Sequence, residues 1–192
     1  MIALTGEVVE LLTEWLPAND DPARPLMQLA TVDAEGRPDV RTVLLSEWTT
    51  DGFYFHTDAN SRKVAELRAN AGVALDLLWP EKGRQLVIRG LAEAASPEEQ
   101  AEAYARRSPY LRQLAWQNTP ELAGLDREQR AGRWAAFQAE HDVAEISAPE
   151  TWVGFLVRPD RLSFWLADPD APSHRVEFTP SGDTWARTHL PG

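Results

Sequence analysis

The chain has no cysteine among its 192 residues. Disulfide bonds and thiolate metal sites are therefore excluded, we expect no metal, and the reducing cytoplasm is the expected location. Basic residues are also few, because 19 Lys and Arg stand against 30 Asp and Glu, a net charge of −11. A nucleic-acid partner requires a basic face, so none is expected. No apolar run approaches the roughly 20 residues of a membrane span, and no signal-peptide pattern opens the chain, so we expect no membrane partner.

Short strand-like runs separated by turn residues make up much of the chain. With 43% hydrophobic and 26% charged residues, the composition is typical of a globular protein, and we expect one domain over residues 1–192. Strand character marks residues 26–33, 39–48, 52–58, 73–79, 84–94, 151–159, 161–168, 174–180 and 184–190. Helical spacing marks residues 5–16, 61–70 and a region from 96 to about 142, which opens with a capping box at Ser96 and Glu99. The pattern predicts a mainly β, α+β fold: a small antiparallel barrel, closed or split, flanked by helices.

The stretch GFYFHTDANSRKVAEL, residues 52–67, places two cations where a helix dipole disfavours them. Ser61, Arg62 and Lys63 stand at the start of a predicted helix, whose free backbone N–H groups bind anions well. A bound phosphate dianion would offset the repulsion between the cations and the dipole. In the alternative interpretation both side chains are solvated, and Arg62 pairs with Glu66 one turn later.

Two other polar residues stand in strand-like runs. Arg41 lies in VRTVLLS, which is apolar on both faces, so its guanidinium needs a partner unless it reaches solvent at a strand end. Gln85 opens QLVIRG, where its amide can donate and accept at the rim of an apolar strand. Most such glutamines only satisfy a neighbouring backbone group. Neither residue identifies a ligand by itself.

Six segments occur in an order that resembles a known family. They are LATVDAEGRPDVRTVLL, GFYFHTDANSRKVAEL, GRQLVIRGLAE, TWVGFLVRPDRLSFW, HRVEF and the terminal W…LPG. From about Pro25 to the C-terminus they resemble the pyridoxamine 5′-phosphate oxidases and their flavin-binding relatives. The resemblance implies a homodimer on a split barrel, with FMN at the subunit interface and a small-molecule substrate. Arg62 and Lys63, helped by Arg41, would then hold the FMN phosphate, and a deazaflavin in place of FMN is an alternative for such barrels.

The resemblance also implies cofactor contacts residue by residue. The matching positions are Arg41, Thr42, Val43, Leu44, His56, Thr57, Ser61, Arg62, Lys63, Gln85, Trp165 and Arg175. His56 stands where the family has tyrosine, and it could equally be a satisfied strand-end residue. Trp165 is one of eight tryptophans, most of which must be core or interface residues. Gln117 and Asn118 correspond only approximately to a Gln-Ser pair of the family.

The expected substrate side departs from the family pattern. Ser46 replaces a lysine that faces the substrate, while Ala171 and Ser173 replace an arginine and a histidine. His174 lies one position from the missing histidine, which makes it the candidate catalytic residue. Misplacing a reacting atom by an ångström can cost about 100-fold in rate, so these changes put the family's own substrate in question.

The substrate-phosphate contacts of the family are half retained. Tyr104 matches, Arg107 matches after a gap of one residue, and Leu111 replaces a serine. The first hypothesis is an FMN-dependent oxidoreductase of the pyridoxamine 5′-phosphate oxidase type, in which a hydride passes from substrate to flavin N5 and O2 reoxidises the flavin to give H2O2. The alternatives are a flavin enzyme of this fold with another small-molecule substrate, and a non-catalytic FMN-binding protein.

Overall fold

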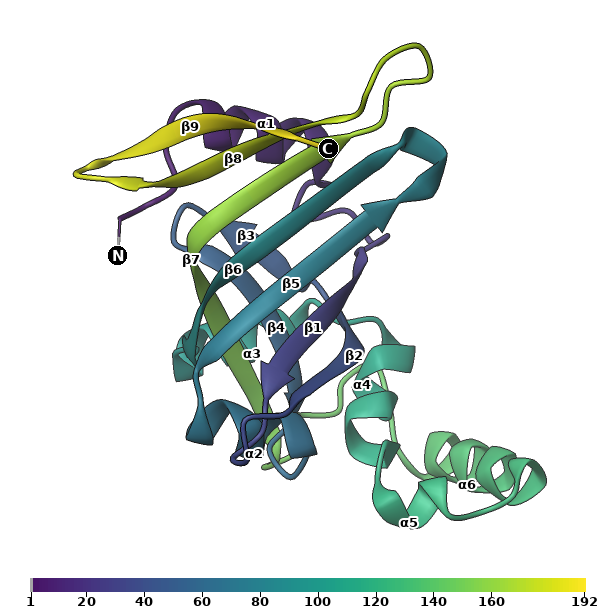
Figure 1. Cartoon of the computed structure of the whole chain (residues 1–192). Coiled ribbons are helices and arrows are strands. Elements are labelled where there is room, and N and C mark those ends of the chain that lie inside the picture. The colour runs from purple at the N-terminus through teal and green to yellow at the C-terminus, as the bar shows by residue number, and fades with distance from the viewer. Residues whose placement is uncertain (1) are drawn as a thin grey trace.

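The computed structural model describes residues 2–192 as one curled antiparallel sheet with helices around it (Figure 1). The strands are β1 (Leu26–Val32), β2 (Pro38–Leu44), β3 (Glu47–Thr49), β4 (Gly52–Asp58), β5 (Gly72–Trp79), β6 (Arg84–Ala94), β7 (Trp152–Leu166), β8 (His174–Ser181) and β9 (Thr184–Pro191). The sheet order is β2-β1-β5-β6-β7-β4-β3, and the β8–β9 hairpin extends from β7. The curl brings β2 toward β4. The predicted α+β split barrel is confirmed.

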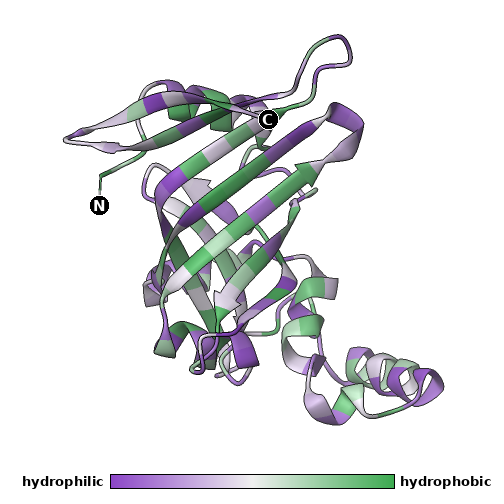
Figure 2. Cartoon of the chain, viewed as in Figure 1, coloured by the Kyte–Doolittle hydropathy of each residue, from purple (hydrophilic) through white to green (hydrophobic). Residues whose placement is uncertain are grey.

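One face of the curled sheet encloses the core. Met27, Leu29 and Leu75 on that face are fully buried, and the residues between them point to the outer face because side chains alternate along a strand. Figure 2 shows this alternation as bands of hydrophobic and hydrophilic residues along the long strands. Helix α1 (Glu7–Trp15) covers one end of the core with Val8, Leu12 and Trp15. The outer face is therefore left for contacts other than the core.

Two strand predictions need correction. The run expected as one strand over residues 39–48 is two strands, because the Leu45 N–H donates to Pro25 O at 3.0 Å and the Ser46 N–H donates to Tyr54 O at 2.8 Å. Ser46 therefore stands at the break between β2 and β3. Conversely, the runs 151–159 and 161–168 form the single strand β7, which continues through Pro159.

A register shift between Arg89 and Gly90 of β6 lets β7 continue through its proline. Proline gives the ladder no N–H, and a bulge in the partner strand is a usual way to accommodate it. A Cβ on Gly90 would lie 2.1 Å from the carbonyl oxygen of Arg158. Glycine at this position therefore permits the close approach of the two backbones.

The helices follow the predicted regions with shorter bounds. They are α2 (Arg62–Ala69), the 3-10 turn η1 (Pro80–Lys82), α3 (Pro97–Ala105), α4 (Pro109–Gln117), α5 (Pro120–Ala123) and α6 (Arg127–Glu140). The predicted capping box of α3 is only half formed. The Glu99 N–H donates to Ser96 Oγ at 3.1 Å, but the Glu99 carboxylate contacts His56 of β4 instead of returning to Ser96. A buried imidazole has taken the acceptor that the local motif would have used.

Helices α4, α5 and α6 form an arm that projects away from the barrel (Figure 1). None of the residues of α6 is buried, although its face carries Trp134 and Phe137. A helix of 14 residues with no core contact gains little from packing within its own chain.

Candidate functional site

The predicted anion site lies where β4 runs into α2. Ser61 occupies the N-cap position of α2 but its side chain caps no backbone N–H. Its hydroxyl instead lies 3.4 Å from Thr57 Oγ1, to which Lys63 Nζ donates at 3.0 Å. Helices α3, α4, α5 and α6 each have a side-chain cap. The start of α2 thus combines uncapped backbone donors, two hydroxyls and an ammonium group.

Arg41 lies beside this site on the core face of β2, opposite Leu29. Its guanidinium donates to Thr31 Oγ1 and to Glu66 Oε2, each at 2.5 Å. Of the two apolar faces of this strand, the outer one is open, since Val40 is 61% exposed. Only the core face buries the arginine, and there Glu66, itself 5% exposed, supplies the partner that a buried charge needs.

Arg62 and Lys63 meet different surroundings. Arg62 is 79% exposed and pairs with Asp39 at 2.8 Å and more loosely with Glu66 at 3.6 Å. The solvated i,i+4 arrangement therefore describes Arg62 in this structure. Lys63 contacts no carboxylate within 4.0 Å in residues 2–192, and its pKa is lowered by burial and then by the nearby Arg41. Asp58 and Glu66 offset part of this lowering from a distance, and a partly buried cation with no carboxylate in contact favours an anionic ligand.

A second group of predicted residues forms one row on the outer face of the sheet. Gln85 of β6 lies opposite Trp165 of β7, and Trp165 lies opposite Arg175 of β8. The Gln85 amide donates to Asp76 Oδ1 at 3.0 Å. Directly opposed residues share a face, so the three side chains point to the same side of the sheet.

The remaining cofactor positions lie on β2. Thr42 is exposed on the outer face and donates to Gln28 Oε1 at 3.1 Å. Val43 is buried in the core, and Leu44 is half-buried opposite Leu26. Within residues 2–192, no hydrogen bond or ion pair links this strand or the row of Gln85 to Lys63.

A third group surrounds Trp152, which sequence reasoning did not single out. The Trp152 ring stacks on His56 with centroids 5.0 Å apart and meets Tyr104 edge-on at 5.4 Å. The Arg107 guanidinium lies 4.2 Å from the centre of the same ring. Ser46 joins the group through His56, whose Nδ1 lies 2.8 Å from Ser46 Oγ. Four predicted residues from three parts of the chain are therefore brought together by one tryptophan.

Two of these side chains carry unmet polar capacity. Burial lowers the pKa of Arg107 to about 10, and its guanidinium makes one hydrogen bond, to Leu111 O at 3.2 Å. Burial also raises the pKa of Tyr104, against a smaller lowering by the Trp116 side chain; the Trp116 N–H donates to Ser147 O, which leaves the buried Tyr104 hydroxyl without a hydrogen-bond partner in residues 2–192. A cation and a hydroxyl placed in this way can receive an anionic group.

Ser173 and His174 lie at the start of β8, just before Arg175 of the row. The carbonyl of Ser173 accepts from the Gly192 N–H at 3.1 Å. His174 is exposed and lies opposite Leu166, on the other side of the strand from Arg175. In this register His174 does not join the row of Gln85 and Trp165.

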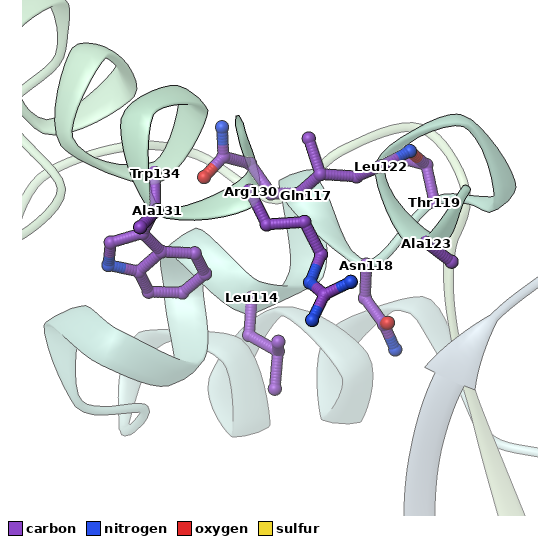
Figure 3. A pocket seen from close by; sticks show the side chains of 9 residues that line it. All are labelled: Leu114, Gln117, Asn118, Thr119, Leu122, Ala123, Arg130, Ala131 and Trp134. Atoms are coloured by element: carbon purple, nitrogen blue, oxygen red, sulfur yellow. The ribbon is translucent and has the colours of Figure 1, made fainter. Parts of the chain in front are cut away.

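A hollow of about 490 Å³ lies within the helical arm (Figure 3). Figure 3 shows Gln117 and Asn118 at its wall, together with Trp134 and Arg130 of α6. Gln117 and Asn118 are the approximate counterparts of the Gln-Ser pair expected from the family resemblance. The hollow is open and belongs to a different part of the molecule from the start of α2.

Residues 18–165 match the family model described as pyridoxamine 5′-phosphate oxidase. The chain belongs to the pyridoxamine 5′-phosphate oxidase family. It is 34% identical over 165 residues to the pyridoxine/pyridoxamine 5′-phosphate oxidase of Haemophilus influenzae strain 86-028NP, covering 85% of this chain and 78% of that protein. It is 37% identical over 202 residues to the protein of the same name from Erythrobacter litoralis, covering 97% and 93%. The family resemblance read from the sequence is confirmed.

Two solved structures have a fold similar to that of this chain. PhzG from Burkholderia lata 383, in complex with tetrahydrophenazine-1-carboxylic acid, matches with a TM-score of 0.78 and 26% identity over 98% of this chain and 94% of that one. A pyridoxamine 5′-phosphate oxidase-related, FMN-binding protein from Nostoc punctiforme matches with a TM-score of 0.69. At 19% identity, the Nostoc likeness concerns the fold alone.

Two features are absent from residues 2–192. None of the helices in this range is long and apolar enough to cross a membrane. The same residues contain no group of three or more His, Cys, Asp or Glu side chains placed to hold a metal ion.

Proposed function

We propose that this chain is an FMN-dependent oxidoreductase that removes a hydride from a small ring substrate. The observation that carries the proposal is the start of α2, where Lys63 is half-buried, lacks a carboxylate partner and stands among uncapped backbone donors. Family membership supports the choice of a flavin phosphate as the anion for that place.

The residues at α2 fit a phosphate dianion in number and charge. Lys63 supplies a point charge, while Ser61 and Thr57 supply hydroxyl donors. Arg41 is held 2.5 Å from Glu66, so it would contribute a positive potential and one edge of its guanidinium. Arg62 is exposed and could swing from Asp39 to the phosphate. Glu66 reduces the net positive charge of the site. It thereby lowers the repulsion among the cations, at a modest cost in affinity for the phosphate.

The flavin ring would meet residues of the outer face. Gln85, Trp165 and Arg175 offer an amide, a flat apolar surface and a cation in one row, and Thr42 to Leu44 offer the backbone of an edge strand. Thr57 would complete the predicted contacts on β4, together with His56 through its backbone, because the His56 side chain is fully buried. Bound FMN supplies hydride acceptance and oxygen reactivity, and the protein binds, orients and shields the reactants.

We propose that the active form is a homodimer. Leu26, Val40 and Leu78 are 62%, 61% and 56% exposed on the outer face of β1, β2 and β5. Leu78 lies opposite Gln85, so the apolar surface continues into the row of proposed flavin contacts. A second copy seated there would cover these side chains and could join site residues that are separate within one chain.

The substrate of the proposed enzyme is a planar ring with an anionic group. Arg107 and Tyr104 would receive the anion, and Trp152 would hold the Arg107 guanidinium in place. Pyridoxamine 5′-phosphate is the first candidate, because the named relatives are pyridoxine/pyridoxamine 5′-phosphate oxidases. A reduced ring carboxylic acid is the second, favoured by the match over nearly the whole chain to PhzG with its tetrahydrophenazine-1-carboxylic acid.

Anaerobic mixing of the FMN-loaded protein with each candidate compound tests this function. We expect one of the two to bleach the flavin absorbance near 450 nm, and admission of O2 to restore it with formation of H2O2. Unphosphorylated pyridoxamine serves as the control for the role of the anionic group. A protein that binds FMN but is bleached by neither compound would favour a non-catalytic flavin-binding protein.

A further inference from the structure

A chain of hydrogen bonds links Ser46, His56 and Glu99 next to the proposed substrate group. Ser46 Oγ lies 2.8 Å from His56 Nδ1, and His56 Nε2 lies 3.2 Å from Glu99 Oε2. The three residues come from the break after β2, from β4 and from α3. A serine, a histidine and a carboxylate in series form an arrangement that can accept a proton at the hydroxyl end.

The acceptor at Glu99 fixes the direction of the chain. An ionised carboxylate only accepts hydrogen bonds, so the proton of the neutral imidazole is on Nε2. His56 Nδ1 is then an acceptor, and the Ser46 hydroxyl donates to it. The serine proton is thus already directed at a base.

The imidazole is held in one orientation by its surroundings. Trp152 stacks on it at an interplanar angle of 5°, and Gly154 lies opposite it across the β4–β7 ladder. A Cβ on Gly154 would lie 2.7 Å from His56 Nε2, so the glycine leaves the space that the ring fills. Such a fixed ring loses no rotational freedom when it receives a proton.

Glu99 is the charged group in direct contact with the imidazole. Within residues 2–192, its Oε1 atom is buried without a hydrogen-bond partner, and its Oε2 atom lies 3.2 Å from His56 Nε2. The other charged group near the ring is Arg107, which lies over Trp152, while Tyr104 adds a neutral phenol. An imidazolium formed by proton transfer would therefore stand beside a carboxylate.

Both ends of the chain reach solvent in part, and its middle does not. The side chain of Glu99 is 14% exposed and Ser46 is half-buried at the strand break, whereas the His56 side chain is fully buried. A ligand placed at the Ser46 end can therefore exchange protons with His56 through the serine hydroxyl.

We propose that Ser46 takes up the proton that the substrate loses on oxidation and that His56, positioned by Glu99, stores it. This inference rests on the proposed function, because it assigns a proton path to that oxidation. Ser46 would be the catalytic residue that touches the substrate, and His56 and Glu99 are positioning residues behind it.

The proposed transfer balances in atoms and electrons. Conversion of a C–H and an adjacent N–H or O–H into a double bond releases one hydride and one proton. The hydride carries both electrons of the C–H bond to the redox cofactor. The proton goes to Ser46 Oγ while the serine proton moves to His56 Nδ1, which leaves an imidazolium beside the Glu99 carboxylate. Reversal of the two proton transfers to water after product release restores the neutral chain.

The proton positions can be tested without turnover. The chain has four histidines, so two-bond ¹H–¹⁵N spectra of the labelled full-length protein can be assigned by His→Gln substitution. We expect neutral His56 to carry its proton on Nε2 and to show the shift of a hydrogen-bonded Nδ1, which moves in Ser46→Ala and returns in Ser46→Thr. A proton on Nδ1, or a spectrum that Ser46→Ala leaves unchanged, would overturn the relay whatever the enzyme's substrate.

Kinetics test the role in the reaction. With the compound that bleaches the wild-type flavin, Ser46→Ala should slow anaerobic bleaching about 100-fold, the low end of what a proton-transfer group contributes, and Ser46→Thr should restore most of it. FMN affinity should be that of the wild type in both variants. Bleaching of Ser46→Ala at the wild-type rate would refute the relay while the proposed function stands. Absence of bleaching in the wild type would refute the proposed function, and the spectra would still decide where the proton lies.

Discussion

Lys63 differs from the nearby Arg41 and Arg62 in having no carboxylate of residues 2–192 in contact with its charged group. Arg41 and Arg62 each contact a carboxylate, whereas the Lys63 ammonium donates only to the Thr57 hydroxyl. Burial and the field of Arg41 both lower the Lys63 pKa. At the scale of single residues, Lys63 is therefore the cation with most to gain from a bound phosphate.

Lys63→Ala is expected to weaken FMN binding strongly. Loss of one charge-assisted hydrogen bond costs about 1.5–3 kcal/mol, which corresponds to a roughly 10- to 150-fold higher Kd. Quenching of flavin fluorescence on binding measures the Kd directly. Arg62→Ala is the matched control and should have a smaller effect, because this side chain is 79% exposed.

The pH dependence of binding provides a second check on the same residue. Because the Lys63 pKa is lowered in the free protein, a bound dianion raises it and binding takes up protons at alkaline pH. FMN affinity should therefore fall as pH rises through that lowered pKa, and Lys63→Arg, which stays protonated, should lose this fall. An equal effect of Arg62→Ala and Lys63→Ala, or a Lys63→Ala variant with wild-type affinity, would contradict the assignment.

At the scale of elements, one glycine of β7 leaves room for a buried ring of β4. Gly154 of β7 gives His56 of β4 the space to stack on Trp152 and to reach Glu99 of α3. The β4–β7 ladder and α3 are thereby tied to the same buried ring. Adding one methyl group at this position disturbs all three elements.

Gly154→Ala is expected to destabilise the fold by about 1–3 kcal/mol, because the new Cβ would lie within 3 Å of a ring that has no room to move. Urea denaturation followed by tryptophan fluorescence measures the change. Gly132→Ala in α6 is the control: its Cβ meets nothing within 4 Å, and alanine should stabilise that helix by about 0.5–1 kcal/mol. Equal effects of the two substitutions would show that His56 is not clamped.

The elements also show how far local sequence patterns reach. Most strands and α2 could be predicted, and so could the grouping of Thr57, Ser61 and Lys63 at its start, because residues 57–63 are neighbours in the chain and their geometry follows from a strand that runs into a helix. The break at Ser46 and the continuation of β7 through Pro159 could not, since each depends on a partner strand distant in sequence. The pairing of His56 with Glu99 spans 43 residues, and the local capping motif at Ser96 pointed elsewhere.

At the scale of the whole molecule, the proposed site residues form three separate groups in one chain. The start of α2 and the Trp152 group are neighbours on opposite faces of β4, through Thr57 and His56, whereas the row of Gln85 lies on β6, β7 and β8. Family membership and fold are established, while the cofactor contacts, including Thr42 to Leu44, and the roles of Ser173 and His174 stay predictions. So do the single domain and the cytoplasmic location.

A double substitution on the outer face tests whether a second copy completes the site. Leu26→Lys with Val40→Lys places two charges on the exposed apolar surface, and we expect a monomer by sedimentation with FMN affinity reduced at least tenfold. Ala186→Lys, at an exposed position of β9, is the control and should stay dimeric and bind FMN like the wild type. A wild-type protein that is monomeric at micromolar concentration and binds FMN tightly would contradict the dimeric site.

The most direct measurement is an absorbance titration of the purified full-length protein with FMN, made in parallel on Lys63→Ala. We expect one FMN per chain for the wild type, with a perturbed flavin spectrum, and a Kd at least tenfold higher for the variant. No spectral change up to a large excess of FMN, or the same Kd for both proteins, would contradict a flavin phosphate at the start of α2.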